Sequence, residues 1–181
     1  MVYIFLGTGF EETEAVVPCD LLRRAGVEVR LVGVSGASVR SSHGIVIESD
    51  CLLSDVDLSK AEMLVLPGGL RGVQSLLDCT EVLDLFSRGW QKGIYVAAIC
   101  AAPTILAKLG IIGNLHATCY PGMEDRMGDA QVCRDSSVVT DGRLITGRAA
   151  GSSFDFGLAL ISALCGEETA RKIAAGIVYT K

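Results

Sequence analysis

Short, almost wholly apolar runs alternate along this chain with longer stretches whose apolar residues recur every three or four positions. The first pattern is typical of strands buried on both faces, and the second is typical of helices. We expect strands in the segments 2–6, 27–34, 62–66, 94–99 and 117–119. We expect helices in the segments 12–24, 80–91, 101–109, 152–164 and 168–177.

Individual residues mark where several of these helices begin and end. Gly26 and Gly110 each follow a helical pattern, where glycine favours the left-handed conformation that ends a helix. Thr80 is expected to cap the helix that follows it. Pro103 fits the first turn of the helix predicted over 101–109, because an N–H group there has no helical partner in any case.

Two further segments have hairpin patterns. Residues 40–48 favour extended or hairpin structure around Gly44. Asp141-Gly142 is a strong turn signal between the apolar runs 137–140 and 144–146. Together with the alternating strands and helices, these patterns predict an α/β fold: a doubly wound, mostly parallel sheet sandwiched by helices, with a small hairpin.

Composition narrows the class of protein. Half of the 181 residues are hydrophobic and a fifth are charged, which excludes general disorder. No linker, repeat or low-complexity segment is visible, so we expect a single domain over residues 1–181. The net charge is −5 with no basic stripe, and only 6% of residues are aromatic, so we expect no nucleic-acid partner.

Location and redox state follow from the same composition. The longest apolar stretch after the N-terminus, 94–112, is interrupted by Pro103 and Lys108, so we expect no membrane span. The first residues lack the basic leader of a secretory signal. The seven cysteines form no C-x-x-C pair and their number is odd, which favours a reduced, cytoplasmic setting.

Ligands of doubly wound folds bind beyond the carboxyl ends of the parallel strands. Three such ends are predicted, at 7–14, 67–72 and 100–103. Gly7-Thr8-Gly9 resembles the start of a dinucleotide fingerprint, but Glu12 occupies the third glycine position, and acids beside a pyrophosphate are unfavourable. We therefore expect no cofactor, and no ligand pattern for a metal is present.

Cys100 lies at the junction between a buried strand and a helix. Ala98 and Ala102, two residues before and after it, are small enough for the tight turn of a nucleophile elbow. The free N–H groups and the dipole of the following helix are expected to favour a thiolate over a thiol. The alternative is that Cys100 is a small residue that fills a tight turn.

The acids Glu11, Glu12 and Glu14 open the first helix. Such a cluster ordinarily compensates the helix dipole on a solvated surface, but one of the three is placed to face the thiol. A protonated Glu beside a thiolate would stabilise it, whereas a carboxylate would repel it. His43 and His116 are the two histidines, and neither position indicates a Cys–His pair.

Four segments together resemble the ThiJ/PfpI superfamily, in the branch that contains bacterial YajL and the human parkinsonism-associated deglycase. They occur in order and at family-like spacing, and the resemblance covers essentially the whole chain. The segments are Gly9-Phe10-Glu11-Glu12-Thr13-Glu14-Ala15, Leu66-Pro67-Gly68-Gly69, Ala97-Ala98-Ile99-Cys100-Ala101-Ala102-Pro103 and Gly151-Ser152-Ser153-Phe154-Asp155-Phe156.

The resemblance implies a flavodoxin-like, cofactor-independent protein that forms homodimers. It implies that Cys100 is an oxidation-sensitive nucleophile and that Glu14 is its protonated partner. It also implies that the N–H groups of Gly69 and Ala101 face the reacting oxygen. The activities implied are glyoxalase conversion of methylglyoxal to lactate and deglycation of early methylglyoxal adducts, with oxidative-stress protection and chaperone behaviour.

Other pocket candidates follow from the same comparison. Gly68 belongs to a strand end that can line an anion pocket. Tyr120 stands where the human relative has a histidine, and His43 where close relatives have an arginine. Arg148 precedes Ala149-Ala150-Gly151, which replaces a Gly-Pro-Gly turn at the pocket rim.

Three functions are consistent with these residues. The first is a cysteine-dependent glyoxalase or deglycase that acts on a small reactive carbonyl compound. The second is a non-enzymatic redox sensor or chaperone that uses oxidation of Cys100. A cysteine peptidase is a distant third, because the protease-like branch has a histidine where this chain has Ala101.

Overall fold

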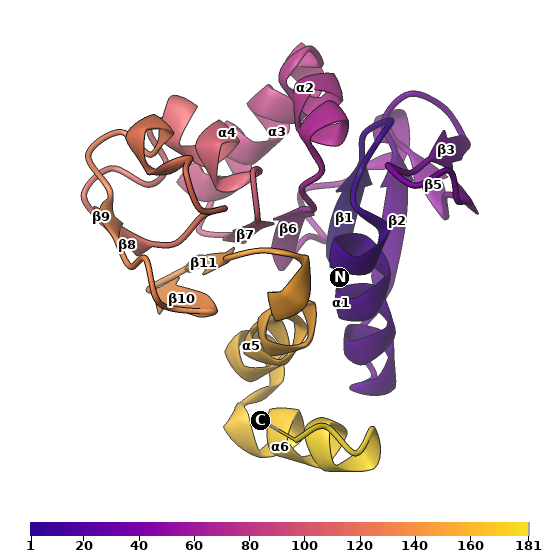
Figure 1. Ribbon diagram of the computed structural model, residues 1–181. Helices are drawn as coiled ribbons and strands as arrows, with labels where there is room; N and C mark the ends of the chain where they lie inside the picture. The colour runs from indigo at the N-terminus through magenta and orange to yellow at the C-terminus, as the bar shows by residue number, and fades with distance from the viewer. Residues whose placement is uncertain (181) are drawn as a thin grey trace.

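A seven-stranded sheet forms the centre of the protein, as a computed structural model that describes residues 1–180 shows (Figure 1). The strands lie in the order β10-β11-β7-β6-β1-β2-β5, and every neighbouring pair is parallel except β10 and β11. Their bounds are β1 Val2–Leu6, β2 Val29–Gly33, β5 Cys51–Leu52, β6 Met63–Leu66, β7 Tyr95–Ile99, β10 Val138–Asp141 and β11 Leu144–Gly147.

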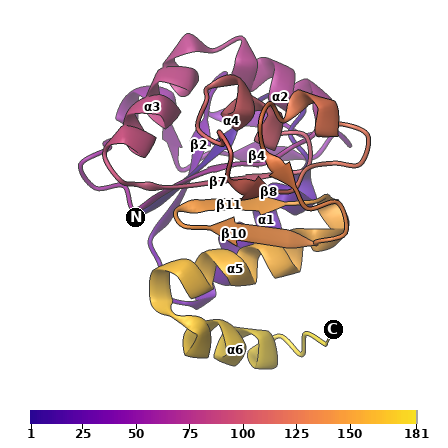
Figure 2. The same cartoon turned by 90° about the vertical axis from the view of Figure 1, so that its left-hand side faces the viewer.

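Helices cover both faces of this sheet, because its strands are apolar on both faces. In β1, Tyr3 and Phe5 pack into one core with α3 and α4, whereas Ile4 and Leu6 pack into the other with α1 and α5. Figure 2 shows α5 and α6 on one side of β10 and β11, and α3 and α4 on the other. The helices are α1 Glu12–Arg24, α2 Leu70–Leu77, α3 Thr80–Gln91, α4 Pro103–Lys108, α5 Ser153–Cys165 and α6 Glu167–Gly176.

The predicted doubly wound, mostly parallel α/β fold is therefore confirmed. The predicted hairpins are also present, one between β3 Ser38–Arg40 and β4 Val46–Glu48 and one between β10 and β11. A further small sheet pairs β8 His116–Ala117 with β9 Gln131–Val132 in parallel. Gly26 ends α1 as expected, with φ of 79°. Over residues 1–180, no helix combines the length and the apolar character that a membrane crossing requires.

Three local predictions were wrong. Helix α2 follows directly after Gly69, where the sequence indicated only a glycine-rich turn. Gly72 lies inside α2 and weakens the helical pattern of this segment in the sequence. Glycine is needed at this position because a Cβ there would lie 2.6 Å from the Cα of Phe10. Cys79, not Thr80, is the N-cap residue of α3. Helix α4 begins at Pro103 and spans only six residues, so Ala101 belongs to the preceding turn.

Candidate active site

The sheet order places β7, β6 and β1 side by side with their carboxyl ends at the same edge. The three strand ends predicted to carry chemistry therefore meet. The Glu11 N–H donates to the Gly68 carbonyl at 3.0 Å, and the Gly72 N–H donates to the Gly9 carbonyl at 3.1 Å. These hydrogen bonds fix the start of α1 against the turn after β6.

Cys100 occupies a strained turn directly after β7. Its φ is 66°, in the left-handed region that residues with a Cβ seldom adopt. The turn is held on both sides, since the Cys100 N–H donates to the Gly147 carbonyl at 2.9 Å and the Cys100 carbonyl accepts from the Tyr120 N–H at 2.8 Å. Ala98 and Ala102 are fully buried, as the tight turn requires. The Cys100 side chain itself is partly exposed and so remains accessible.

Glu14 does not lie on a solvated surface: its side chain is completely buried. The Gly68 N–H donates to Oε2 of Glu14 at 2.7 Å, while Oε1 has no hydrogen-bond partner within residues 1–180. Burial raises the pKa of Glu14 to about 7, against the hydrogen bonds of Cys100 and Gly68, which lower it; the charge of Glu11 adds a smaller upward contribution. A substantial fraction of Glu14 is therefore protonated near neutral pH.

The Cys100 thiol is coupled to this carboxyl group. Burial, followed by the charge of Glu14, raises the pKa of Cys100 to about 12, and the N–H groups of Gly69 and Ala101 oppose the rise. The expectation of a thiolate favoured by the helix dipole is thus corrected, because α4 begins three residues after Cys100. Protonation of Glu14 removes the repulsive charge, so the state of Glu14 controls the ease with which Cys100 ionises.

Two consecutive glycines allow this close arrangement. A Cβ on Gly68 would lie 2.6 Å from Oε2 of Glu14 and 2.7 Å from the Cβ of Cys100. Gly69 has φ of 83°, and a Cβ there would lie 2.6 Å from the Gly9 carbonyl oxygen. Both positions therefore require glycine for the backbone to approach Glu14 and Cys100.

A cavity of about 340 Å³ opens beside the thiol. The predicted residues Gly69, Ala101 and Tyr120 line it together with Cys100 and Glu14. Glu11 also lines it, one of the acids that open α1, as do Ala149, Ala150 and Gly151 of the turn expected at the pocket rim. The sequence did not indicate the remaining walls, Leu70 and Met123, since an apolar residue near a turn carries no local signal of a cavity.

Three predicted pocket residues do not line this cavity: Gly68, His43 and Arg148. Gly68 instead donates its N–H to Oε2 of Glu14. His43 is 70% exposed, and its Nδ1 lies 3.0 Å from Oε1 of Glu12. Arg148 precedes the cavity wall, and its N–H donates to the Ser137 carbonyl at 2.9 Å. The predictions for His43 and Arg148 were wrong because family position specifies the backbone segment but not the direction of a new side chain.

His43 instead belongs to a small polar cluster at the start of α1. Ligand atoms of Glu11, Glu12 and His43 lie within 4.8 Å of one another, a spacing suited to a metal ion. Ser42 Oγ lies 3.1 Å from a Glu11 oxygen and 3.0 Å from a Glu12 oxygen, so its single proton is shared between the two carboxylates. This hydroxyl therefore links the two acids of the cluster.

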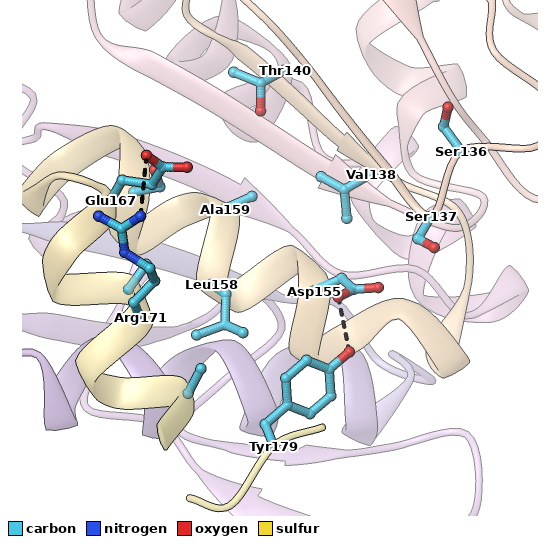
Figure 3. A pocket seen from close by; sticks show the side chains of 13 residues that line it. Ser136, Ser137, Val138, Thr140, Asp155, Leu158, Ala159, Glu167, Arg171 and Tyr179 are labelled. Carbon is cyan, nitrogen blue, oxygen red and sulfur yellow. Dashed lines mark hydrogen bonds and ion pairs between the residues drawn. The ribbon is translucent and has the colours of Figure 1, made fainter. Parts of the chain in front are cut away.

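A larger cavity of about 670 Å³ lies between β10, α5 and α6 and shares no lining residue with the cavity at Cys100 (Figure 3). Tyr179 closes one end of it through a hydrogen bond of 2.8 Å to Asp155, and Arg171 lies 4.0 Å from Glu167 on the opposite side. Among residues 1–180, no cysteine or histidine lines it. The smaller cavity at Cys100 is therefore the candidate active site.

Comparison with known proteins is consistent with this geometry. The chain is 37% identical over 177 residues to "Protein dj-1beta" of Drosophila melanogaster, covering 97% of this chain and 95% of that protein. A crystal structure of Drosophila melanogaster DJ-1beta superimposes with a TM-score of 0.94 at 36% identity, covering 99% of this chain and 98% of the other.

The name of a further relative includes an enzymatic activity. "Glutathione-independent glyoxalase DJR-1.2" of Caenorhabditis elegans is 31% identical over 173 residues, which cover 94% of this chain and 91% of that protein. The family model described as DJ-1/PfpI matches residues 1–163. With its buried glutamic acid beside a cysteine on a strained turn, and with relatives along nearly its whole length, the chain belongs to the DJ-1/PfpI family.

Proposed function

We propose that this protein is a cysteine-dependent, cofactor-independent enzyme of the glyoxalase or deglycase type. Its substrate would be methylglyoxal or an early methylglyoxal adduct, and its role would be protection against carbonyl and oxidative stress. The observation that carries this proposal is the coupling of an accessible thiol, Cys100, to a buried carboxyl group, Glu14, whose pKa is about 7. The glyoxalase named among the relatives supports the same reaction class.

The proposed reaction starts with attack of the Cys100 sulfur on the aldehyde carbon of methylglyoxal, which forms a hemithioacetal. The N–H groups of Gly69 and Ala101 are placed to stabilise the oxygen of this intermediate. Glu14 then removes the proton from the former aldehyde carbon and returns a proton to the neighbouring carbon. The resulting S-lactoyl thioester is hydrolysed by water, which releases lactate and the free thiol.

This mechanism assigns Glu14 a proton-transfer role for which its pKa is suited. A group that titrates near pH 7 can accept and return a proton at physiological pH, whereas an ordinary carboxyl group is a weak base there. Tyr120 lines the cavity, and no histidine within residues 1–180 does. The proposal therefore places all proton transfer on Glu14.

The test is methylglyoxal turnover by the purified wild type, Cys100→Ser and Glu14→Gln, with lactate as the measured product. We expect both variants to lose at least about a hundredfold in kcat/KM. Turnover by Cys100→Ser equal to that of the wild type would refute a cysteine-dependent reaction. A fold control by circular dichroism accompanies each variant.

A redox sensor or chaperone is the second candidate. The partial exposure of Cys100, together with donors at Gly69 and Ala101, favours it, because these N–H groups can also bind the oxygens of a sulfinate. Selective oxidation of Cys100 by mild peroxide, ahead of the six other thiols, is its expected signature in peptide mass spectrometry. Equal oxidation of all seven cysteines would exclude it.

We also propose that the protein works as a cytoplasmic homodimer. Exposed apolar side chains lie on three neighbouring elements: Val16 on α1, Ile45 and Val46 in the hairpin, and Phe154 on α5. Helices α1 and α5 pack together, and the Ser42 N–H of the hairpin donates to the Phe10 carbonyl just before α1. Analytical ultracentrifugation tests this proposal, and a monomer at micromolar concentration would overturn it.

A further inference from the structure

The cavity around Cys100 contains acidic groups without a basic one. Glu11 and Glu14 are the two charged residues among its lining, and no lysine, arginine or histidine within residues 1–180 lines it. Glu14 is buried behind the thiol, whereas the Glu11 side chain keeps 18% of its surface exposed. Glu11 is therefore the acid that a small molecule meets on its way to Cys100.

Several contacts hold Glu11 at this position. Its N–H donates to the Gly68 carbonyl at 3.0 Å, which ties its backbone to the turn beside the thiol. Its carboxylate accepts hydrogen bonds from Ser42 Oγ at 3.1 Å and from Thr13 Oγ1 at 3.4 Å. Glu11 is also the N-cap residue of α1, where a negative charge is stabilised. The carboxylate is thus a fixed charge rather than a mobile surface group.

The neighbouring Glu12 provides an internal comparison. It accepts a hydrogen bond from the same Ser42 hydroxyl at 3.0 Å and lies 3.0 Å from His43, but it does not line the cavity. Glu11 and Glu12 therefore share charge, cluster and helix end, and they differ in that Glu11 lines the cavity and Glu12 does not. The charge of Glu11 also reaches the buried end of the site, since it raises the pKa of Glu14.

We propose that Glu11 is a specificity-determining residue that admits uncharged or cationic carbonyl compounds to Cys100 and rejects those that carry a carboxylate. Two negative charges a few ångströms apart in a partly buried site repel each other by an amount worth on the order of tenfold in rate. 2-Oxoaldehydes without an acid group would react, and 2-oxoaldehydes that also carry a carboxylate would be disfavoured. The choice of carbonyl substrates rests on the proposed function, whereas the charge selection at Cys100 does not.

The test uses alkylation, which needs no catalytic turnover. Iodoacetamide and iodoacetate are nearly the same size. In each reaction the sulfur forms a bond to the CH₂ carbon of the reagent and iodide leaves. Only iodoacetate is an anion. The rate of Cys100 modification by each reagent is measured by peptide mass spectrometry and normalised to N-acetylcysteine. The wild type should disfavour iodoacetate by on the order of tenfold relative to that free thiol.

Glu11→Gln should raise the normalised iodoacetate-to-iodoacetamide ratio toward one, with the remaining charge of Glu14 keeping it below one, and Glu12→Gln should leave it at the wild-type value. A Glu11→Gln ratio equal to that of the wild type, or an equal change in Glu12→Gln, would overturn the proposal. Glu11→Ser is a second uncharged variant that retains an N-cap oxygen if Glu11→Gln folds poorly. It should give the same ratio as Glu11→Gln.

Turnover then extends the test to substrates. Methylglyoxal and 4,5-dioxopentanoate are both 2-oxoaldehydes that can isomerise to a 2-hydroxy acid, but only 4,5-dioxopentanoate also carries a carboxylate. The wild type should therefore prefer methylglyoxal, and Glu11→Gln should narrow that preference by on the order of tenfold. Absence of turnover with both compounds in the wild type would refute the proposed function and leave the alkylation ratio to decide on charge selection. An unchanged methylglyoxal preference in an active Glu11→Gln enzyme would overturn the role of Glu11.

Discussion

The N–H of Gly68 donates a hydrogen bond of 2.7 Å to Oε2 of Glu14, across 54 positions of sequence. This contact joins the end of β6 to the first turn of α1 and fixes the carboxyl group beside Cys100. The other oxygen of Glu14 has no partner within residues 1–180, so one side of the carboxyl group is anchored and the other is left for chemistry. The site's acid–base behaviour depends on this arrangement.

Gly68→Ala should damage the site directly. Its Cβ would lie 2.6 Å from the Glu14 carboxyl oxygen and 2.7 Å from the Cys100 Cβ, so one of them must move. We expect a loss of about 2 kcal/mol or more in the free energy of unfolding, measured by urea denaturation, and a large loss of Cys100 reactivity. Gly176→Ala, at the end of α6 and with nothing within 4 Å of the new Cβ, is the control and should lower neither stability nor reactivity. Equal behaviour of the two variants would contradict this account.

Glu14→Gln should change how stability depends on pH. The pKa of Glu14 is raised from 4.5 to about 7 in the folded protein, so the folded state holds this proton more tightly than the unfolded state. Stability contributed by the protonated form is therefore present at pH 4.5 and is lost as the pH rises to about 7. The loss is on the order of 3 kcal/mol for this shift.

The variant has no such titration, so it should gain stability relative to the wild type across this pH range. Urea denaturation of both proteins at pH 4.5, 6 and 8 measures the difference. Parallel curves for the two proteins would show that Glu14 titrates normally when folded.

The same substitution should ease ionisation of the thiol. The negative charge of Glu14 contributes to the raised pKa of Cys100, and Gln at this position cannot carry that charge. The rate of Cys100 alkylation by iodoacetamide, compared at each pH between 7 and 10, should therefore be higher in Glu14→Gln than in the wild type. Glu12→Gln serves as the control and should keep the wild-type rate. A lower rate in Glu14→Gln across this range would mean that a protonated Glu14 stabilises the thiolate instead.

Backbone strain at Cys100 gives a prediction about stability alone. With φ of 66°, a residue that has a Cβ is strained there, and glycine is not. Cys100→Gly should therefore be more stable than Cys100→Ala by about 1 kcal/mol, since both variants lack the thiol. Thermal denaturation of the two variants compares them directly. The reverse order would show that the turn imposes no strain on its central residue.

The sequence by itself determined the layers of this protein and the place of its nucleophile. Apolar runs that are buried on both faces predict strands such as β1 and β7, and the period of the apolar residues predicts helices such as α1 and α5. The small residues around Cys100 predict a tight turn for a local steric reason. These features depend on neighbours within a few positions, so they can be inferred without a fold.

Only the tertiary structure decided which acid is buried and which side chains form the cavity. Glu11, Glu12 and Glu14 all open the same helix and have the same side chain. The packing of α1 against the turn after β6 buries Glu14, places Glu11 in the cavity wall and leaves Glu12 beside His43. For the same reason, Met123 lines the cavity and Arg148 does not. Contacts between distant segments depend on the order of the strands, and no local pattern encodes that order.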